Sequence, residues 1–487
     1  MPTPPDTAEP PAAPRSTDDL LALARDERVR FLRLQFTDIL GVTKNVEVPA
    51  SQFARALAGE VLFDGSAIEG FERAEESDML LRPDPATFRV LPWGHAAGHA
   101  TNPAAAASDD ARVARVLCDV TTTAGAPFAG DPRAVLRRQL ERAAAAGFQV
   151  RAGTEVEFFL FHPDAEGAAT TRTHDVGGYF DLAPVDAGED ARRAMVDLLE
   201  RMGVEVDGAH HEGAHGQHEI DLREAPALEA ADRVVTLRHV VKHVARQFGL
   251  VASFMPKPVF GQNGSGMHTQ LAFYHAGAGR ADAGRNAFDA GGAGDAPNAN
   301  REGGPGEYGL SRTALHAVGG LLRHARGMSA VTNPLVNSYK RLVPGFEAPV
   351  HVAWSLKVRT PMVRVPERRG QATRLEVRTP DPAANPYLSL AVLVAAALDG
   401  VAGRAEWREP VTEEVDEMSY RERRRLRVDD LPHDLNEACD ELERDDAVRA
   451  ALGDHVTRHY LAAKRREWRE YITQVTRWEL DRYLGLY

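Results

Sequence analysis

The chain has 487 residues, of which 43% are hydrophobic and 26% charged, and its formal net charge is −13 at pH 7. This balance is typical of a globular protein with a sizeable core, and it argues against binding along a nucleic-acid phosphate backbone. Two cysteines cannot build a disulfide framework, and no uninterrupted apolar run is long enough to cross a bilayer. We therefore expect a cytoplasmic protein of more than one domain, with a disordered Pro- and Ala-rich tail at residues 1–15.

The elements predicted before residue 128 form a small, mainly β unit. A capping box that begins at Ser16 opens a short helix through Arg28. The further elements, in chain order, are strands at 30–36 and 43–48, a helix at 51–57, a Gly-punctuated loop at 63–71, and strands at 87–91 and 115–120. Residues 97–110 are low in complexity and predict a surface excursion. A boundary near 128–132 gives an N-terminal domain at 16–127.

The remaining chain, 128–487, predicts a larger domain that mixes helices and strands. Its predicted helices cover 133–145, 189–203, 232–249 and 387–401, and a charged helical stretch runs from 434 to the end. Its predicted strands cover 154–161, 217–223, 266–273, 350–356 and 374–379. Residues 276–309 are rich in Gly, Ala, Asp and Asn, which predicts a mobile insertion.

The strand at 154–161 carries two carboxylates on one face. Since side chains alternate along a strand, Glu155 and Glu157 point together while Val156, Phe158 and Leu160 point the other way. Burying two unpaired carboxylates side by side is costly unless divalent cations lie between them, and oxygen ligands suit Mg²⁺ or Mn²⁺. On this segment alone, a half-exposed strand whose acidic face meets solvent is the simpler interpretation.

Four other stretches carry the same kind of polar face. They contain Glu212 and Glu219; His268 and Gln270 after a Gly-rich turn; Arg374, Glu376 and Arg378; and Lys340, Arg341, Arg359 and Arg364 around the loop 343–349. Carboxylates with one imidazole would hold hard cations, and arginines would clamp phosphoryl and carboxylate oxygens, as in metal-assisted phosphoryl transfer. Three alternatives remain open: a satisfied core histidine, arginines that are plain surface charge, and cross-strand ion pairing at 374–378.

Several long motifs occur in the order found in one known family. They are Phe63-Asp-Gly-Ser-Ala-Ile-Glu-Gly-Phe71, Glu75-Glu-Ser-Asp78, Glu155-Val-Glu157, Asn263-Gly-Ser-Gly-Met-His268, Asn337-Ser-Tyr-Lys-Arg-Leu-Val-Pro-Gly-Phe-Glu-Ala-Pro349 and Asp381-Pro-Ala-Ala-Asn-Pro386. Together they resemble the signature blocks of prokaryotic (type I) glutamine synthetase, from about residue 29 to the end.

The resemblance implies an α+β fold, with a small β-grasp N-terminal domain and a larger catalytic domain built on a curved antiparallel sheet. It implies an ATP-dependent ligase that joins ammonia to the γ-carboxylate of glutamate through γ-glutamyl phosphate. It also implies two to three Mg²⁺ or Mn²⁺ per site, ATP as co-substrate, and a dodecamer of two stacked hexamers with each active site between neighbouring subunits.

The resemblance also assigns residues, motif by motif. The ligands of one metal would be Glu157, Glu212 and Glu219, and those of the other Glu155, His268 and Glu376. Substrate would be bound by Asn263, Gly264, His268, Arg341, Glu347 and Arg378. ATP would be bound by Asp207, Gln270, Arg359, Arg364 and Arg374, with Arg359 also catalytic. Asp64, donated by a neighbouring subunit, would bind and deprotonate ammonium. Glu347, also catalytic, would close the site as part of a flap that excludes water and would accept the proton from the tetrahedral adduct.

The sequence departs from the family pattern at a few positions. The family's usual Ser is Ala67, a common Asn is Val358 and a common Pro is His215. Asp429 stands at the position of the adenylylated Tyr of enterobacterial-type enzymes, so we expect no adenylylation. Arg73 resembles a determinant of glutamine feedback in the Bacillus-like, non-adenylylated subgroup, and the Tyr487 terminus is similar to that subgroup.

Two rival functions follow from the same residues. One is a γ-glutamyl ligase that uses another amine, such as a polyamine or ethanolamine; retention of the Asp64 loop favours ammonia. The other is a glutamine-sensing ring that binds a regulatory protein, and the presence of all six assigned metal ligands favours an enzyme.

Overall fold

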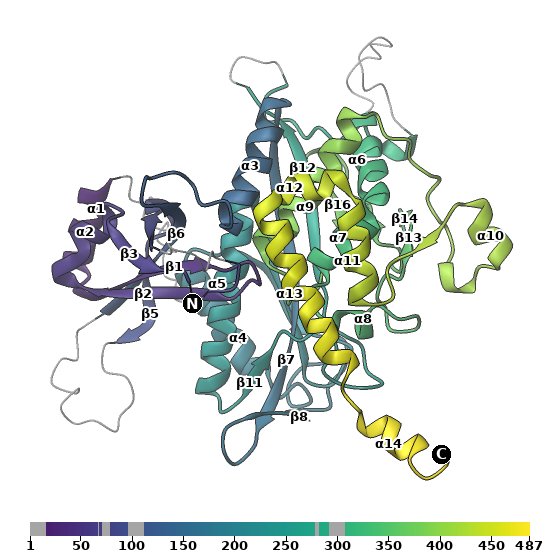
Figure 1. Cartoon of the computed structure of the whole chain (residues 1–487), viewed down its shortest axis with the longest axis horizontal. Coiled ribbons are helices and arrows are strands. Elements are labelled where there is room, and N and C mark those ends of the chain that lie inside the picture. The colour runs from purple at the N-terminus through teal and green to yellow at the C-terminus, as the bar shows by residue number, and fades with distance from the viewer. Residues whose placement is uncertain (1–15, 67, 71–77, 96–111, 278–281, 292–306) are drawn as a thin grey trace, which may run out of the picture.

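The computed structural model describes residues 16–487 except 67, 71–77, 96–111, 278–281 and 292–306. Two sheets organise the molecule: a smaller one formed near the N-terminus and a larger one at the centre, over which the C-terminal helices lie (Figure 1). Among the described helices, none combines the length and the hydropathy needed to span a bilayer.

The smaller sheet is built from six described strands. They are β1 (Val29–Thr37), β2 (Thr43–Pro49), β3 (Val61–Asp64), β4 (Asp78–Pro83), β5 (Arg89–His95) and β6 (Arg112–Thr122). Their order is β2-β1-β6-β4-β3 with β5 paired to β6, and β1 runs parallel to β6. Alternating apolar residues of β1 and β6 fill its core, together with Leu20 of α1 (Thr17–Asp26) and Phe53 of α2 (Phe53–Leu57). Ser16 caps α1 in the predicted capping box with Asp19.

The larger sheet carries the polar face predicted from the sequence. Its strands are β7 (Phe148–Pro163), β8 (Ala169–Thr173), β9 (Val206–His211), β10 (Gln217–Pro226), β11 (Val251–Ser253), β12 (Met267–His275), β14 (Trp354–Ser355), β15 (Val363–Arg364) and β16 (Leu375–Val377). The order is β14-β15-β16-β12-β7-β10-β9, with β8 and β11 also paired to β7. Of the described pairs in this sheet, only β14 with β15 is parallel. A separate pair joins β13 (His351–Val352) to β17 (Asp429–Asp430).

Helices surround the larger sheet. They are α3 (Pro132–Ala145), α4 (Glu189–Arg201), α5 (Ala227–Gln247), α6 (Arg312–Arg323), α7 (Ala325–Thr332), α8 (Ser338–Arg341), α9 (Pro386–Ala402), α10 (Tyr420–Arg425), α11 (Leu435–Arg444), α12 (Asp446–Leu452), α13 (Asp454–Ile472) and α14 (Arg477–Tyr483). Short 3₁₀ turns cover Ala50–Gln52, Pro85–Thr87, Glu307–Gly309, Gly370–Ala372 and Val415–Glu417. Because α9 is apolar on all sides, it is buried among the other helices.

The predicted alternation of β7 is confirmed on its apolar side. Val156, Phe158 and Leu160 are fully buried in a core shared with α4 and α5. Glu155 and Glu157 therefore lie on the opposite side of β7, which pairs with β10 and β12.

Three predicted elements need correction. The strand expected at 350–356 is two short strands in different sheets, because the Ala353 amide bonds the His351 carbonyl and turns the chain between them. Helix α5 begins at Ala227 rather than at Asp232, since Asp232 pairs with Arg133 instead of capping a helix. The loop expected from residue 63 begins later, because β3 continues through Asp64.

One buried arginine ties the smaller sheet to the helices of the larger domain. Arg133 of α3 forms ion pairs with Asp84 at 2.6 Å, with Asp119 of β6 at 2.8 Å and with Asp232 of α5 at 2.9 Å. The hydroxyl of Tyr387 in α9 donates to Asp232 at 2.7 Å. We call these five residues the Arg133 network; it links Asp119 of the smaller sheet to helices α3, α5 and α9 of the larger domain.

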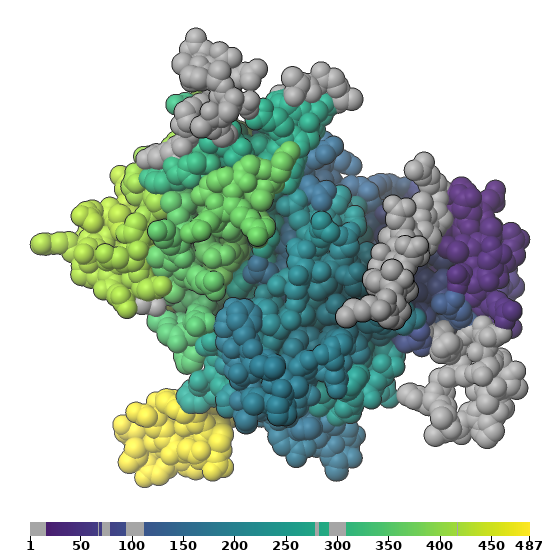
Figure 2. Space-filling view, turned by 180° about the vertical axis from the view of Figure 1, so that it is seen from behind, coloured from purple at the N-terminus to yellow at the C-terminus, as the bar shows by residue number. Residues whose placement is uncertain are grey.

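The chain ends in a helix that stands away from the body. Helix α14 lies apart from the other helices in Figure 1 and forms a separate lobe in Figure 2. Helix α14 and the residues after it expose large apolar side chains, among them Trp478 in the helix and Leu484 and Leu486 beyond it. A single chain leaves this apolar surface in water.

Candidate active site

Carboxylates from separate strands meet on one face of the larger sheet. In the strand register, Glu157 of β7 lies opposite Glu219 of β10, and Glu155 lies opposite His268 of β12. Glu376 of β16 lies opposite Gln270 of β12. Directly opposed residues point to the same side of a sheet, so the fold gathers these side chains.

The first group consists of Glu155, His268 and Glu376, whose potential ligand atoms all lie within 4.8 Å of one another. His268 Nδ1 is 3.2 Å from Glu155 Oε2. Burial alone would raise the pKa of Glu155, but hydrogen bonds from His268 and from Gln270 outweigh it and bring this pKa down to about 2. Burial lowers the pKa of His268, so its imidazole is neutral and keeps one nitrogen lone pair for a cation.

The cross-strand alternative is also observed in this group. Glu376 is paired with Arg364 of the neighbouring strand at 2.7 Å and with Arg378 at 2.6 Å. Two arginines predicted to meet ATP and glutamate therefore pair with Glu376.

The second group consists of His210, Glu212 and Glu219, again with ligand atoms within 4.8 Å, and Glu157 adjoins it. Burial, and next the negative charge of Glu212, raise the pKa of Glu157 to about 8. Burial and the charge of Glu157 raise the pKa of Glu219 well above its usual value, and burial raises the pKa of Glu212. Within the described residues, no lysine or arginine forms an ion pair with these three carboxylates.

These carboxylates fit a divalent cation by their chemistry. Glu212, Glu219 and Asp221 lie close together, and burial raises the pKa of all three. Gly266 leaves room beside them: a Cβ there would lie 2.8 Å from His268 Nε2 and 2.8 Å from Arg341 Nη2. Oxygen ligands with one imidazole per group suit Mg²⁺ or Mn²⁺.

The predicted glutamate-binding residues lie around the Gly-rich turn before β12. Arg341 donates to the backbone carbonyls of Thr379 at 2.8 Å and Arg378 at 3.0 Å. Gly264 packs so closely that a Cβ would lie 2.4 Å from the Pro256 carbonyl oxygen and 3.0 Å from the Arg341 side chain. Asn263 donates to Glu347 at 3.3 Å, which brings the turn and the predicted flap together.

The flap itself has an unusual backbone. Glu347 has φ of +54°, a left-handed conformation that residues other than glycine rarely adopt. The Lys257 ammonium lies 3.5 Å from the ring centre of Phe346, beside it in the flap. The loop at 343–349 is therefore held against the turn that carries Asn263.

The predicted nucleotide-binding residues are more scattered. Gln270 donates to Glu155 and Arg364 pairs with Glu376, so both lie in the first group. Arg359 is exposed and bonds the Tyr179 hydroxyl. The Nε of Arg374 is buried without a partner among the described residues, and Asp207 is exposed on β9.

Some predicted residues lie away from this face or outside the described part. Asp64 ends β3 in the smaller sheet, and the loop after it is fastened to α13 through Glu69 with Arg466. Arg73 and Ala67 fall outside the described residues. Of the other departures, the His215 amide bonds Gln262, and the Val358 carbonyl accepts from Ser355.

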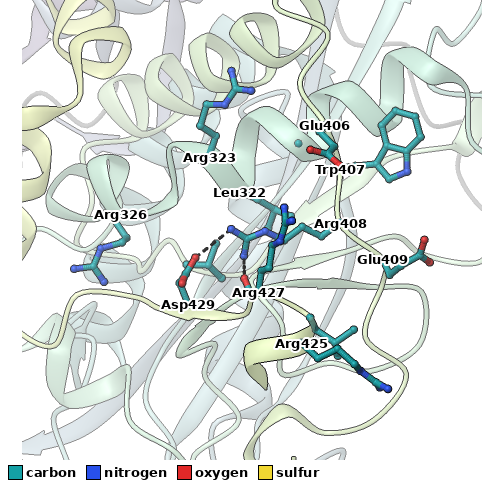
Figure 3. Close-up of a pocket in the computed structure, with 13 residues that line it drawn as sticks. Leu322, Arg323, Arg326, Glu406, Trp407, Arg408, Glu409, Arg425, Arg427 and Asp429 are labelled. Carbon is teal, nitrogen blue, oxygen red and sulfur yellow. Dashed lines mark hydrogen bonds and ion pairs between the residues drawn. The ribbon is translucent and has the colours of Figure 1, made fainter. Parts of the chain in front are cut away.

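Asp429 borders a cavity of about 580 Å³ on another part of the molecule, between α6, α7 and the segment 406–429. The cavity is rich in arginine, and Arg408 pairs with Asp429 at 3.1 Å. Figure 3 shows the guanidinium groups of Arg323, Arg326 and Arg425 pointing in different directions, so they do not converge on one ligand.

Four residues of the site were not predicted. They are His210, Gln217, Asp221 and Tyr179. Gln217, Glu219 and Asp221 occupy alternate positions of β10, so strand periodicity could have found the first and last. No comparable signal singled out Tyr179, because its loop has no regular period.

Comparisons with known proteins agree with this architecture. The family model described as "Glutamine synthetase, catalytic domain" matches residues 129–483, and that described as "Glutamine synthetase, beta-Grasp domain" matches 28–123. The chain is 53% identical to a glutamine synthetase of Thermus thermophilus over 96% of this chain and 99% of that one. It is 47% identical to those of Clostridium saccharobutylicum and Staphylococcus aureus, over 96% of this chain and 99% and 98% of theirs.

Solved structures give the same picture. A GmaS complex with ADP superposes with a TM-score of 0.81 at 33% identity, over 96% of this chain and 99% of that one. A glutamine synthetase of Plasmodium falciparum gives 0.80 at 21% identity, over 97% and 99%, and supports the fold alone. The predicted α+β fold with a β-grasp domain is thus confirmed, and this chain belongs to the glutamine synthetase family of ATP-dependent ligases.

Proposed function

We propose that the carboxylate face of the larger sheet is where this glutamine synthetase ligates ammonia to the γ-carboxylate of glutamate. The observation that carries the proposal is convergence: Glu155, His268 and Glu376 form one ligand group, and Glu212 and Glu219 belong to another that Glu157 adjoins. These residues come from five separate segments of the chain. A solvated acidic strand would not place them together under burial.

The residue roles follow from the contacts. Glu155, His268 and Glu376 would hold one Mg²⁺ or Mn²⁺, and Glu157, Glu212 and Glu219, with His210, another. Bound cations neutralise phosphate charge during formation of the acyl phosphate. Arg364 would bind ATP and Arg378 would bind glutamate, both from beside Glu376, and the exposed Arg359 would bind ATP.

Asp64 would act from a neighbouring subunit, since its own sheet lies away from the carboxylate face. Two exposed apolar surfaces support an assembly. The loop 176–185 beside His210 exposes Val176 and Leu182, each at 72%, and the C-terminal segment 477–487 exposes Trp478, Leu484 and Leu486. Apolar surfaces of this kind mark contacts between chains. A dodecamer of two stacked hexamers is the assembly that the resemblance predicts.

Substrate specificity is tested by phosphate release. Full-length protein with Mg²⁺, ATP and glutamate should release phosphate with ammonium and form glutamine, and much less with polyamines or ethanolamine. Glu157→Ala is the control for contaminating activity. Equal or faster release with another amine would favour the alternative γ-glutamyl ligase.

Regulation and address remain predictions from the sequence. Glutamine feedback through Arg73 is tested by adding glutamine to the same assay with Arg73→Ala. The absence of adenylylation rests on Asp429, and both cysteines are free and buried, in keeping with a cytoplasmic address. A glutamine-sensing role with a protein partner is compatible with catalysis at the same site.

A further inference from the structure

A second cluster of titratable side chains lies beside the Glu212 loop. His174, Asp175, Asp186 and His218 place potential ligand atoms within 4.8 Å of one another. A positive charge already occupies this cluster: the Arg192 guanidinium is 2.7 Å from His218 Nδ1 and 2.7 Å from Asp186 Oδ2. Arg192 therefore supplies the positive charge of this cluster, and the neighbouring segment that the cluster contacts is the Glu212 loop.

Asp175 is the centre of that support. Its carboxylate accepts from His174 Nε2 at 2.9 Å and His211 Nε2 at 3.1 Å. It also accepts from three backbone amides: Gly216 at 2.9 Å, Ala187 at 3.2 Å and Gly177 at 3.3 Å. Burial alone would raise the pKa of Asp175, but the hydrogen bonds from the two histidines outweigh it and hold this pKa well below its usual value.

Two of these contacts lead directly to Glu212. The imidazole of His211, anchored to Asp175 through Nε2, contacts the Glu212 carbonyl oxygen through Nδ1 at 2.7 Å. The Gly216 amide lies at the other end of the loop that joins β9 to β10. Asp175 therefore contacts both ends of the short loop that carries Glu212: His211 before it and the Gly216 amide at its end.

Close packing around Asp175 and His211 restricts the backbone of the loop that carries Glu212. A Cβ on Gly177 would lie 2.7 Å from the His211 ring, and one on Gly216 would lie 3.0 Å from the Leu160 carbonyl oxygen. Gly216 also has φ of +70°, which favours glycine. The loop can therefore take few other paths while Asp175 is in place.

We propose that Asp175, through His211 and the Gly216 amide, is a positioning residue that sets the place of Glu212 among the carboxylates of the second group. The inference rests on the proposed role of Glu212 as a metal ligand. Residues that orient ligands from behind typically change metal affinity about 10- to 100-fold when replaced.

The test is Mn²⁺ binding to the metal-free, full-length protein, followed by electron paramagnetic resonance. Asp175→Asn keeps the shape but cannot accept all five donors, and it should raise the Kd of one Mn²⁺ about 10-fold while leaving the other unchanged. Hydrogen exchange should become faster at the amides of Gly216 and Gln217. Asp186→Asn is the matched control, because Asp186 is a buried carboxylate of the same cluster that makes no described hydrogen bond to residues 211–217.

Glu212→Ala separates the inference from the proposed function. If Glu212→Ala weakens Mn²⁺ binding while Asp175→Asn binds like the wild type, the positioning role is wrong and the ligand role stands. If Glu212→Ala binds both ions normally, the ligand assignment fails and the inference falls with it. Should Asp175→Asn not fold, His211→Gln carries the same expectation, since it keeps Asp175 but loses one of the two contacts of the imidazole.

Discussion

Two buried groups of charges in this molecule are handled in opposite ways. In the Arg133 network, one guanidinium with a side chain 4% exposed meets three carboxylates, so each of them has a cationic partner within the protein. Burial alone would lower the pKa of Arg133, but the charge of Asp232 outweighs it and raises this pKa above its usual range. The carboxylates of Glu157 and Glu219 are also buried and that of Glu212 is half-buried, but the three have no described arginine or lysine partner. The contrast teaches that buried carboxylates paired with arginine link parts of the fold, whereas buried carboxylates without such a partner indicate a site for a bound cation.

The variant expected to test this contrast with the largest effect is a substitution of Glu219. Glu219→Gln mimics the protonated carboxyl group, so it should remove activity by about 10³-fold, because cation binding supplies several kcal/mol to the transition state. The same change should raise the unfolding temperature of the metal-free protein at about pH 9, above the pKa of Glu157 of about 8. Initial rates measure the loss of activity, and thermal unfolding measures the change in unfolding temperature.

Glu155→Gln is the matched control on the same face. It should also abolish activity, but it should lower the metal-free stability, since His268 and Gln270 bond the ionised Glu155. A Glu219→Gln protein that unfolds at a lower temperature than the wild type at this pH would show that the second group is internally matched after all.

The Arg133 network gives the second prediction. Arg133→Met leaves Asp84 and Asp232 without their cation and Asp119 with Arg137 alone, and breaking such a buried pair costs about 3–5 kcal/mol. Urea unfolding measures the loss in the free energy of unfolding. Arg137→Met is the control: its side chain is 40% exposed and also pairs with Asp119, at 2.9 Å, so the loss should stay below about 1 kcal/mol. Equal losses in the two variants would contradict a special role for burial.

A smaller, pH-dependent effect is expected at His324. Burial lowers the pKa of His324, but hydrogen bonds with Asp445 at 2.8 Å and Asp399 at 3.0 Å outweigh it and raise this pKa; Arg323 also faces Asp399 at 3.5 Å. A raised pKa in the folded state stabilises the protein fully below the unfolded value of about 6.5, and the gain is lost as pH rises through the folded value. His324→Gln should therefore cost about 2 kcal/mol at acidic pH and less at alkaline pH.

Unfolding midpoints between about pH 5.5 and 8.5 measure this difference. His316→Gln is the control, because His316 bonds the Ala405 carbonyl oxygen rather than a carboxylate. A gap between wild type and His324→Gln that does not change with pH would mean that the histidine is neutral.

Strand periodicity predicted the central part of the site. The alternation of β7 put Glu155 and Glu157 on one side because that rule depends only on backbone geometry. It could not predict that Glu376 pairs with Arg364, since that contact depends on which strands become neighbours. Nor could it find the division at Ala353, where a local turn overrides β-branched propensity, or the roles of Arg192 and Asp175, which depend on loops without a period.

The left-handed backbone of Glu347 has a consequence for how this position responds to selection. An L-residue in that conformation costs about 1 kcal/mol, and glycine would relax it. Selection for heat resistance alone would therefore favour glycine at 347, whereas the role proposed for Glu347 predicts that selection for turnover would keep the carboxylate. In a mutational library, the two screens should disagree at this one codon.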